Sequence, residues 1–138
     1  MILQTQTTSF KKELYQAIHD FTVDTIKIAL YTSLADLNEN TTAYTTSNEV
    51  VGTGYVAGGK VLTGTTIESS GFTAWISFNN VVWNPAAFTT RCALIYNASK
   101  ANRAIAVLDF GADKTCTNTF TITMPASTAT AALIRSSN

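Results

Sequence analysis

The chain has 138 residues, of which 46% are hydrophobic, and its formal net charge is zero. This length and hydrophobic content predict one folded domain with a core of its own and exclude a disordered chain. The nine basic residues are scattered and no apolar run reaches 18 residues, so the composition excludes a basic nucleic-acid-binding surface and a membrane-spanning helix.

The N-terminal segment, residues 1–8, is polar and rich in Thr and Gln, and we expect a flexible arm ahead of a single β-rich domain, residues 9–138. The chain start lacks the charged and apolar regions of a secretory signal, so we expect synthesis in the cytoplasm without signal cleavage. Ser9 has the chemistry of a helix N-cap. The apolar residues after it recur at helical spacing and predict one amphipathic helix: Phe10, Leu14, Ala17, Ile18 and Phe21.

Strand patterns begin after this helix. Residues 25–32, TIKIALYT, alternate between apolar and other side chains and predict a strand. Residues 41–64 are neutral and rich in Gly and Thr. Because glycines at this density serve backbone conformations that other residues resist, we expect a long ordered excursion rather than a linker.

The second half of the chain predicts a series of strands. Two apolar segments, FTTRCALIYN and RAIAVLDFG, are joined by the five-residue loop ASKAN and predict a hairpin buried on both faces. The AALIR segment near the C-terminus predicts an edge strand. Alternation predicts strands in two further segments, residues 71–83 and 118–125. In the first, Phe72, Ala74, Ile76 and Phe78 lie on the face opposite Thr73, Trp75 and Ser77, and in the second Phe120, Ile122 and Met124 point inward.

Together these patterns predict a mainly β protein: an antiparallel β-sandwich or barrel of about seven or eight strands with one N-terminal amphipathic helix. Trp75, Trp83 and the seven phenylalanines are expected to supply most of the apolar burial.

The chain offers few residues for chemistry. His19 is the only histidine, and without a nucleophile or second ligand we interpret it as a partner of the helix dipole. Asp109 and Asp113 flank a glycine but lack the ligand spacing of calcium loops. The segment GTGYVAGG, residues 52–59, lacks the dinucleotide fingerprint and the P-loop lysine. We therefore predict no enzyme, no catalytic residue, no cofactor and no metal.

Two further pairs of residues bear on redox state and contacts. Cys92 lies in an apolar run and Cys116 in a polar stretch, and we expect free thiols rather than a disulfide because no secretory signal is present. Tyr44 and Tyr55 flank the glycine-rich region. Aromatic side chains on neutral loops are good contact anchors, so we name both as candidate partner-contact residues, with ordinary loop packing as the alternative.

The surface composition favours a protein that functions as part of a larger assembly. Only 13% of residues are charged, and the chain contains 24 Thr. A neutral hydroxyl surface loses little when it is desolvated against another protein, whereas buried Lys and Glu are costly. The alternative explanation is that β-rich sequences use Thr for its strand propensity.

Five segments carry a resemblance to a known family: SFKKELYQAIHDF, DTIKIALYTS, TTAYTTSNEVVGTGYVAGGKVL, RCALIYNASKANRAIAVLDFG and FTITMP. Over residues 9–124 the chain resembles a family of small structural proteins of tailed bacteriophages. Its most specific parts are residues 49–59 and 93–110. Cys92 departs from the pattern, which has a small residue such as Gly there.

The resemblance implies a virion component, and the best-fitting role is a capsid decoration (cement) protein. Such a protein is made in the host bacterial cytoplasm, binds the major capsid protein outside the head shell as a homodimer or homotrimer, and stabilises the shell by mass action. Residues 1–8 and 41–59 would supply contacts. A tail, baseplate or fibre-associated subunit is the alternative, and a carbohydrate-binding module using Trp75 and Trp83 is a third possibility.

Overall fold

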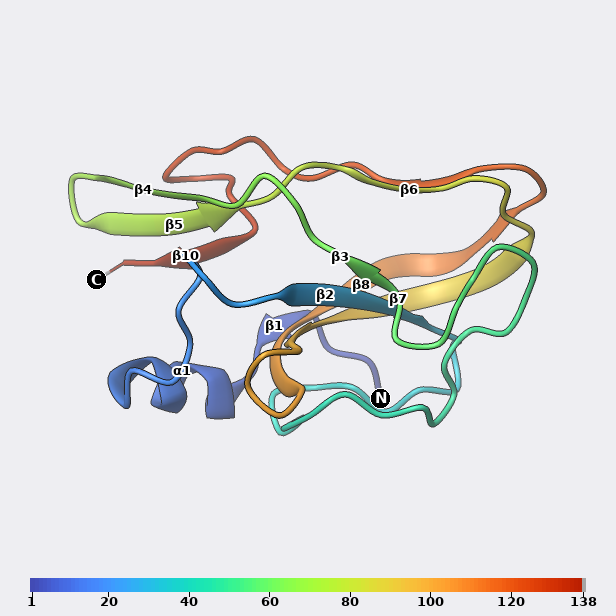
Figure 1. The fold of residues 1–138 in the computed structure, drawn as a ribbon, viewed down its shortest axis with the longest axis horizontal. Coiled ribbons are helices and arrows are strands. Elements are labelled where there is room, and N and C mark those ends of the chain that lie inside the picture. The colour runs from blue at the N-terminus through green and yellow to red at the C-terminus, as the bar shows by residue number, and fades with distance from the viewer. Residues whose placement is uncertain (138) are drawn as a thin grey trace.

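The structure is a computed structural model that describes residues 1–137. It is mainly β, with 43% strand and 6% helix, and its sheets are antiparallel. Figure 1 shows two layers of strands, with the short helix α1 (Thr8–Tyr15) at one end below them. This arrangement confirms the fold class predicted from the sequence.

The layers are a five-stranded sheet and a second layer made of two smaller sheets. The five-stranded sheet has the order β1 (Thr5–Gln6), β8 (Arg103–Cys116), β7 (Phe88–Asn97), β2 (Ile26–Tyr31) and β3 (Lys60–Val61). The second layer pairs β10 (Ile134–Ser136), β5 (Thr73–Ser77) and β4 (Thr66–Ser70), and separately β6 (Val81–Trp83) with β9 (Phe120–Ile122). Residues 1–137 thus form ten strands rather than seven or eight, because several have only two or three residues and leave no periodic pattern.

The β7–β8 hairpin is the centre of the molecule and confirms the predicted pairing. Residues 98–102 form its loop, and Asn97 pairs with Arg103. Strand β2 pairs along the other side of β7, from Ile26 opposite Asn97 to Tyr31 opposite Cys92. Because β7 lies inside the sheet and is covered on both faces, its residues from Cys92 to Asn97 are all buried.

Two clusters of buried side chains cover the two faces of the five-stranded sheet. The larger lies between the layers and includes Trp83, Phe10 and Ile28. The smaller lies on the outer face and includes Tyr31, Cys92, Leu94 and Tyr96. The chain between β2 and β3 covers this outer face, where Figure 1 shows it below the sheet. The excursion predicted from its glycines is therefore part of the core.

The helix differs from its prediction at both ends. Its N-cap is Thr7, whose hydroxyl accepts a hydrogen bond from the Phe10 N–H, so the Ser9 assignment was wrong. The helix ends at Tyr15, and Ala17 has a positive φ of 56°. Of the apolar stripe, Phe10 and Phe21 are buried, but Phe21 is contributed by the chain after the helix.

Strand β5 places Trp75 in the core, as expected, but leaves Phe72 outside it. Trp75 and Ser77 are buried, whereas Phe72 is 88% exposed. Phe72 belongs to the turn between β4 and β5, so it lies outside the core and does not contribute the apolar burial expected of it. Farther along the chain, Phe120, Ile122 and Met124 contact the main core as predicted.

Residues 1–8, expected to form a flexible arm, are hydrogen-bonded to the rest of the domain in this structure. Thr5 and Gln6 pair with Val107 and Ala106, and the Leu3 N–H donates to the Leu37 carbonyl. Thr7, the helix cap, is fully buried. Removing the segment would therefore delete a strand and a cap rather than a free arm.

Candidate functional site

The carboxylate of Glu49 holds the glycine-rich segment on the outer face of the five-stranded sheet. This carboxylate is buried and accepts hydrogen bonds from the Tyr44 hydroxyl at 2.8 Å, the Tyr55 hydroxyl at 3.2 Å and the Gly58 N–H at 3.0 Å. Tyr96 donates to the Gly58 carbonyl at 2.6 Å and stacks on Tyr44. We call these five residues the Glu49 clamp.

The clamp accounts for the two tyrosines that the sequence nominated as partner contacts. Tyr44 and Tyr55 are half-buried, and Tyr55 also accepts a hydrogen bond from the Leu30 N–H. Burial and the neighbouring Glu49 carboxylate raise the pKa of both phenols, and that of Tyr96 to about 12. The hydroxyls thus stay protonated and donate, which fixes the loop. Their contact with a partner stays a prediction.

A second polar cluster surrounds His19, which lies beyond the end of the helix rather than at its dipole. His19 is buried, with Nε2 2.9 Å from Glu13 Oε1 and Nδ1 3.0 Å from Asn97 Nδ2. The Asn97 amide nitrogen also donates to Asp24 Oδ2 at 2.7 Å. Because an amide nitrogen can only donate, Nδ1 accepts and Nε2 carries the hydrogen toward Glu13. Both ring nitrogens therefore have structural partners.

Two ion pairs complete this cluster: one ties the helix to the start of β8, and the other ties the segment before β2 to the β7–β8 loop. Glu13 pairs with Arg103 at 2.8 Å, and Asp24 pairs with Lys100 at 2.8 Å. Burial would raise the pKa of Asp24, but hydrogen bonds from the Asp20 N–H, Lys100 and Asn97 outweigh it and lower that pKa to about 2. For Glu13, the hydrogen bonds from His19 and Arg103 likewise outweigh burial and lower the pKa.

Asp24 is expected to make the protein more stable at neutral than at acid pH. Its folded pKa lies below the ordinary value of 3.8, so its contribution is present above pH 4 and is lost as the pH falls toward about 2. Asp24→Asn should therefore lower the free energy of unfolding by about 2 kcal/mol at pH 7 and by much less at pH 2.5. Urea titrations at both pH values measure this, with the exposed Asp36→Asn as the control. An equal loss at both values would contradict the assignment.

The other candidates from the sequence are structural. Asp109 accepts hydrogen bonds from Arg91 and from the Gly111 N–H. Within residues 1–137, no three His, Cys, Asp or Glu side chains are placed to hold a metal ion. Cys92 and Cys116 are free, buried thiols, as predicted, and burial raises the pKa of Cys92 to about 12.

The two tryptophans are core residues. Trp83 is almost fully buried, and Trp75 is buried with its indole N–H donating to Ser127. Neither ring therefore offers a free face for stacking on a sugar. In the part of the chain that the structure describes, no helix combines the length and apolar character that crossing a membrane requires.

A groove runs along one edge of the sandwich, where β1 and β8 face the segment from β9 to β10. It consists of three adjoining cavities of about 510, 800 and 610 Å³. The first shares Gln4, Leu108, Pro125 and Leu133 with the second, and Thr5, Gln6, Arg135 and Ser137 with the third. We call this the edge groove.

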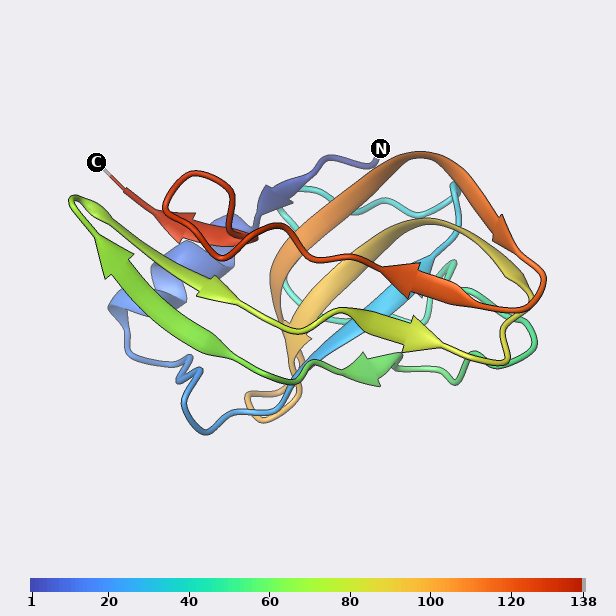
Figure 2. The same ribbon diagram turned by 90° about the horizontal axis from the view of Figure 1, so that it is seen from above.

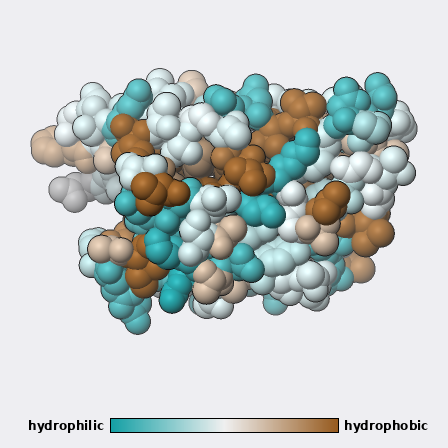
Figure 3. All heavy atoms as spheres, in the orientation of Figure 1, coloured by the Kyte–Doolittle hydropathy of each residue, from teal (hydrophilic) through white to brown (hydrophobic). Residues whose placement is uncertain are grey.

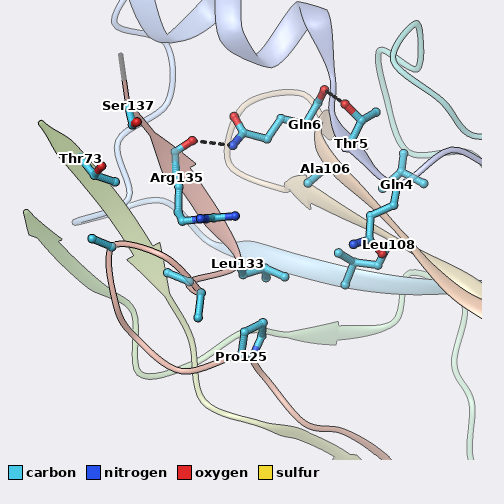
Figure 4. A pocket seen from close by; sticks show the side chains of 14 residues that line it. Gln4, Thr5, Gln6, Thr73, Ala106, Leu108, Pro125, Leu133, Arg135 and Ser137 are labelled. Atoms are coloured by element: carbon cyan, nitrogen blue, oxygen red, sulfur yellow. Dashed lines mark hydrogen bonds between the residues drawn. The ribbon is translucent and has the colours of Figure 1, made fainter.

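Figure 4 shows the central cavity of the edge groove. The Gln6 side chain on β1 reaches across it and donates to the Arg135 carbonyl on β10 at 2.9 Å. This hydrogen bond links the edges of the two layers. Leu108 on β8 and Leu133, just before β10, line the same cavity.

The floor of the edge groove is where the main core reaches the surface. Five half-buried hydrophobic residues that pack on the core line it: Leu108, Phe110, Phe120, Met124 and Leu133. Thr, Ser, Gln and Asn form much of the rim, and the charged lining residues are Lys11, Asp113, Lys114 and Arg135. An apolar floor with a mainly neutral, polar rim suits the binding of another molecule. The sequence marked Phe120 and Met124 as inward but gave no sign that the two sheet edges leave them uncovered.

Comparison with known proteins identifies no relative. No protein-family model matches the chain, and no curated protein or solved structure matches it. The resemblance to phage structural proteins therefore stays a prediction from the sequence, and the functional argument depends on the surface of the domain.

Proposed function

We propose that this protein is a structural subunit of a tailed-bacteriophage virion, and in the first place a capsid decoration protein that binds the major capsid protein outside the head shell. The observation that carries the proposal is the clamped segment between Tyr44 and Gly58. Its backbone is fixed by Glu49, yet it exposes Val51 and Val56 by 94% and 75%. A rigid loop that presents apolar side chains loses little entropy when it binds a partner.

The rest of the surface supports a binding role. Figure 3 shows separate hydrophobic patches among residues of intermediate and hydrophilic character on one face. With 13% charged residues, this surface carries few groups that are costly to desolvate against another protein. A surface of this kind suits contact with a protein lattice.

The mechanism would be mass action. A subunit that binds only the assembled shell stabilises that shell, and the stabilisation grows with the free concentration of the subunit relative to its Kd. A homodimer or homotrimer would engage several equivalent shell sites at once and gain avidity. The Glu49 clamp would contribute by keeping the contact loop in one conformation before binding.

The copy number of the protein in purified virions tests the proposal. A ratio to the major shell protein near a simple fraction is expected for decoration. A handful of copies would favour the alternative, a tail, baseplate or fibre-associated subunit. Absence from the particle would overturn the structural role.

The contact loop has its own test. Val51→Asp is expected to fold normally and to weaken binding to particles that lack the protein by at least tenfold, because a charge would be buried in the contact. Val23→Asp, at a similarly exposed valine outside the loop, is the matched control and should bind as the wild type does. Co-sedimentation with particles measures both. Equal binding of the two variants would remove the loop from the contact.

A further inference from the structure

We propose that two copies of this chain form a dimer by exchanging their N-terminal segments, residues 1–15, which carry β1 and α1. Each segment would dock on the other copy in the way that it docks on its own chain in this structure, with residues 16–18 as the hinge. The inference goes beyond the proposed function, because it concerns different residues from the clamped segment and holds whether or not the chain belongs to a virion. The structure shows what covers the docking surface, since residues 1–15 already lie on it.

The N-terminal segment is held by residues far along the chain. Strand β1 pairs with β8, and the Thr7 N–H donates to the Ile105 carbonyl at 2.9 Å. The Glu13 carboxylate on α1 pairs with Arg103 at 2.8 Å. These partners lie at least 90 residues away in the sequence. None of these contacts depends on the connection to residue 16, so the same segment of a second copy would make all of them.

The surface that receives the segment begins at His19, directly after the hinge. The His19 ring is buried and accepts a hydrogen bond from the Asn97 amide on β7 at 3.0 Å, so it is anchored to the body of the domain. Its other nitrogen lies 2.9 Å from Glu13, and its ring contacts Phe10 edge to face, with centroids 5.1 Å apart. Exchange restores these contacts between copies as well, so only residues 16–18 need to change conformation.

The hinge is exposed and strained at Ala17. Helix α1 ends in a Schellman motif, in which the Ile18 N–H donates to the Glu13 carbonyl at 3.1 Å. The Ala17 N–H donates to the Leu14 carbonyl at 3.2 Å. The motif holds Ala17 at φ 56°, a left-handed conformation that glycine adopts without penalty and alanine does not. Opening the hinge releases this strain, and a short hinge under strain favours exchange between copies.

The position of the hinge suits a two-fold arrangement. Figures 1 and 2 both show α1 at one end of the molecule, and its last residue, Tyr15, is 94% exposed. An extended chain covers about 3.3–3.6 Å per residue, so the four steps from Tyr15 to His19 span about 13–14 Å when the hinge is open. Two open hinges that cross at this end connect the copies. Because the exchange is reciprocal, the dimer is closed and grows no further.

The hinge and the protein concentration set the balance between the closed monomer and the exchanged dimer. Every contact of the N-terminal segment is replaced by an identical contact in the dimer, so these contacts favour neither state. The strain at Ala17 is relieved twice in each dimer and favours exchange, whereas the lost translational and rotational freedom of two copies favours the monomer. Exchange is therefore expected at high local concentration.

Ala17→Gly tests the hinge. Glycine removes the strain from the closed turn, so the association constant of the dimer should fall about tenfold or more. Ala101→Gly is the matched control, because Ala101 is also a left-handed alanine, with φ 55°, but lies in the β7–β8 loop, which is the same in monomer and dimer. Its association should equal that of the wild type. Sedimentation velocity measures association after refolding from urea at a series of protein concentrations.

Two cysteine substitutions show where the segment docks. Gln6 on β1 lies opposite Ala106 on β8. Gln6→Cys and Ala106→Cys are made in separate full-length chains, which are mixed, refolded together and treated with oxidised glutathione. The new thiols meet only where β1 of one chain pairs with β8 of the other, so a covalent one-to-one dimer is expected. The native Cys92 and Cys116 are buried, and each variant treated alone is the control.

Three outcomes would overturn the proposal: a wild type that stays monomeric after refolding at millimolar concentration, mixed cysteine variants without a covalent dimer, or a dimer that Ala17→Gly leaves unchanged. Circular dichroism checks the fold of each variant. If Ala106→Cys does not fold, Thr5→Cys with Val107→Cys, the other facing pair of β1 and β8, takes the place of the first pair. None of these outcomes depends on the copy number in virions.

Discussion

Replacing Gly59 by Ala is expected to destabilise the protein by about 4 kcal/mol. Gly59 has φ +77°, where a side chain is strained by about 1–2 kcal/mol, and its added Cβ would lie 1.8 Å from the Ile28 carbonyl oxygen. Because that oxygen belongs to the backbone of β2, it cannot move aside as a flexible side chain would. The resulting overpacking adds about 1–3 kcal/mol. Urea denaturation measures the loss.

Gly71→Ala is the matched control for this effect. Gly71 also has a positive φ, of +57°, but nothing lies within 4 Å of its added Cβ. Gly71→Ala should therefore lower the free energy of unfolding only by the backbone strain, about 1–2 kcal/mol. Equal losses at the two positions would mean that the segment carrying Gly59 moves away from β2 without penalty, and the docking of the excursion would then contribute little to stability.

Replacing Glu49 by Ala is expected to destabilise the protein by about 3 kcal/mol. The substitution leaves the Tyr44 hydroxyl, the Tyr55 hydroxyl and the Gly58 N–H without their shared acceptor. A buried donor that loses its partner costs about 1–3 kcal/mol, and the half-exposed tyrosines recover part of this from water. Urea denaturation gives the loss, and amide hydrogen exchange should become faster throughout residues 41–59.

Two further substitutions separate the charge of Glu49 from its hydrogen bonds. Glu49→Gln retains one acceptor oxygen and the side-chain volume, so about half the loss is expected. Glu68→Ala removes an exposed carboxylate and should stay within about 0.5 kcal/mol of the wild type. If Glu49→Ala behaved like Glu68→Ala, the clamp would not hold the loop.

The sequence predicted the fold where a pattern is local and long. The β7–β8 hairpin was predictable because its consecutive apolar residues are buried on both faces, and strand β2 was predictable from its alternation. The glycines near Gly59 indicated an ordered excursion. Strand β1 was not predictable, because two polar residues carry no period and pair only through their backbone with Val107 and Ala106. Phe72 was expected in the core because phenylalanine is usually buried, and its pattern did not show that it occupies the turn between β4 and β5.

The two polar clusters could not be predicted from the sequence, for a different reason. Glu49, Tyr44 and Tyr55 fell within one noticed motif, but nothing local indicated that the carboxylate joins the two hydroxyls. His19 meets Asn97, which lies 78 residues away, so their contact depends on the completed fold. The edge groove likewise forms between β8 and the segment from β9 to β10, and the gap between two sheets has no counterpart in the pattern of either strand.

The pairing of β1 with β8 has a consequence for synthesis on the ribosome. Thr5 and Gln6 have their partners at Val107 and Ala106, and Glu13 has its ion-pair partner at Arg103. Translation proceeds at roughly 5–20 residues per second, so these partners are synthesised about 5–20 s after the first strand and the helix. During that interval Phe10 has no core to enter, so the nascent N-terminus is an apolar segment that chaperones can bind. The N-terminal quarter of the chain is thus synthesised first and docks only after the β7–β8 hairpin has formed.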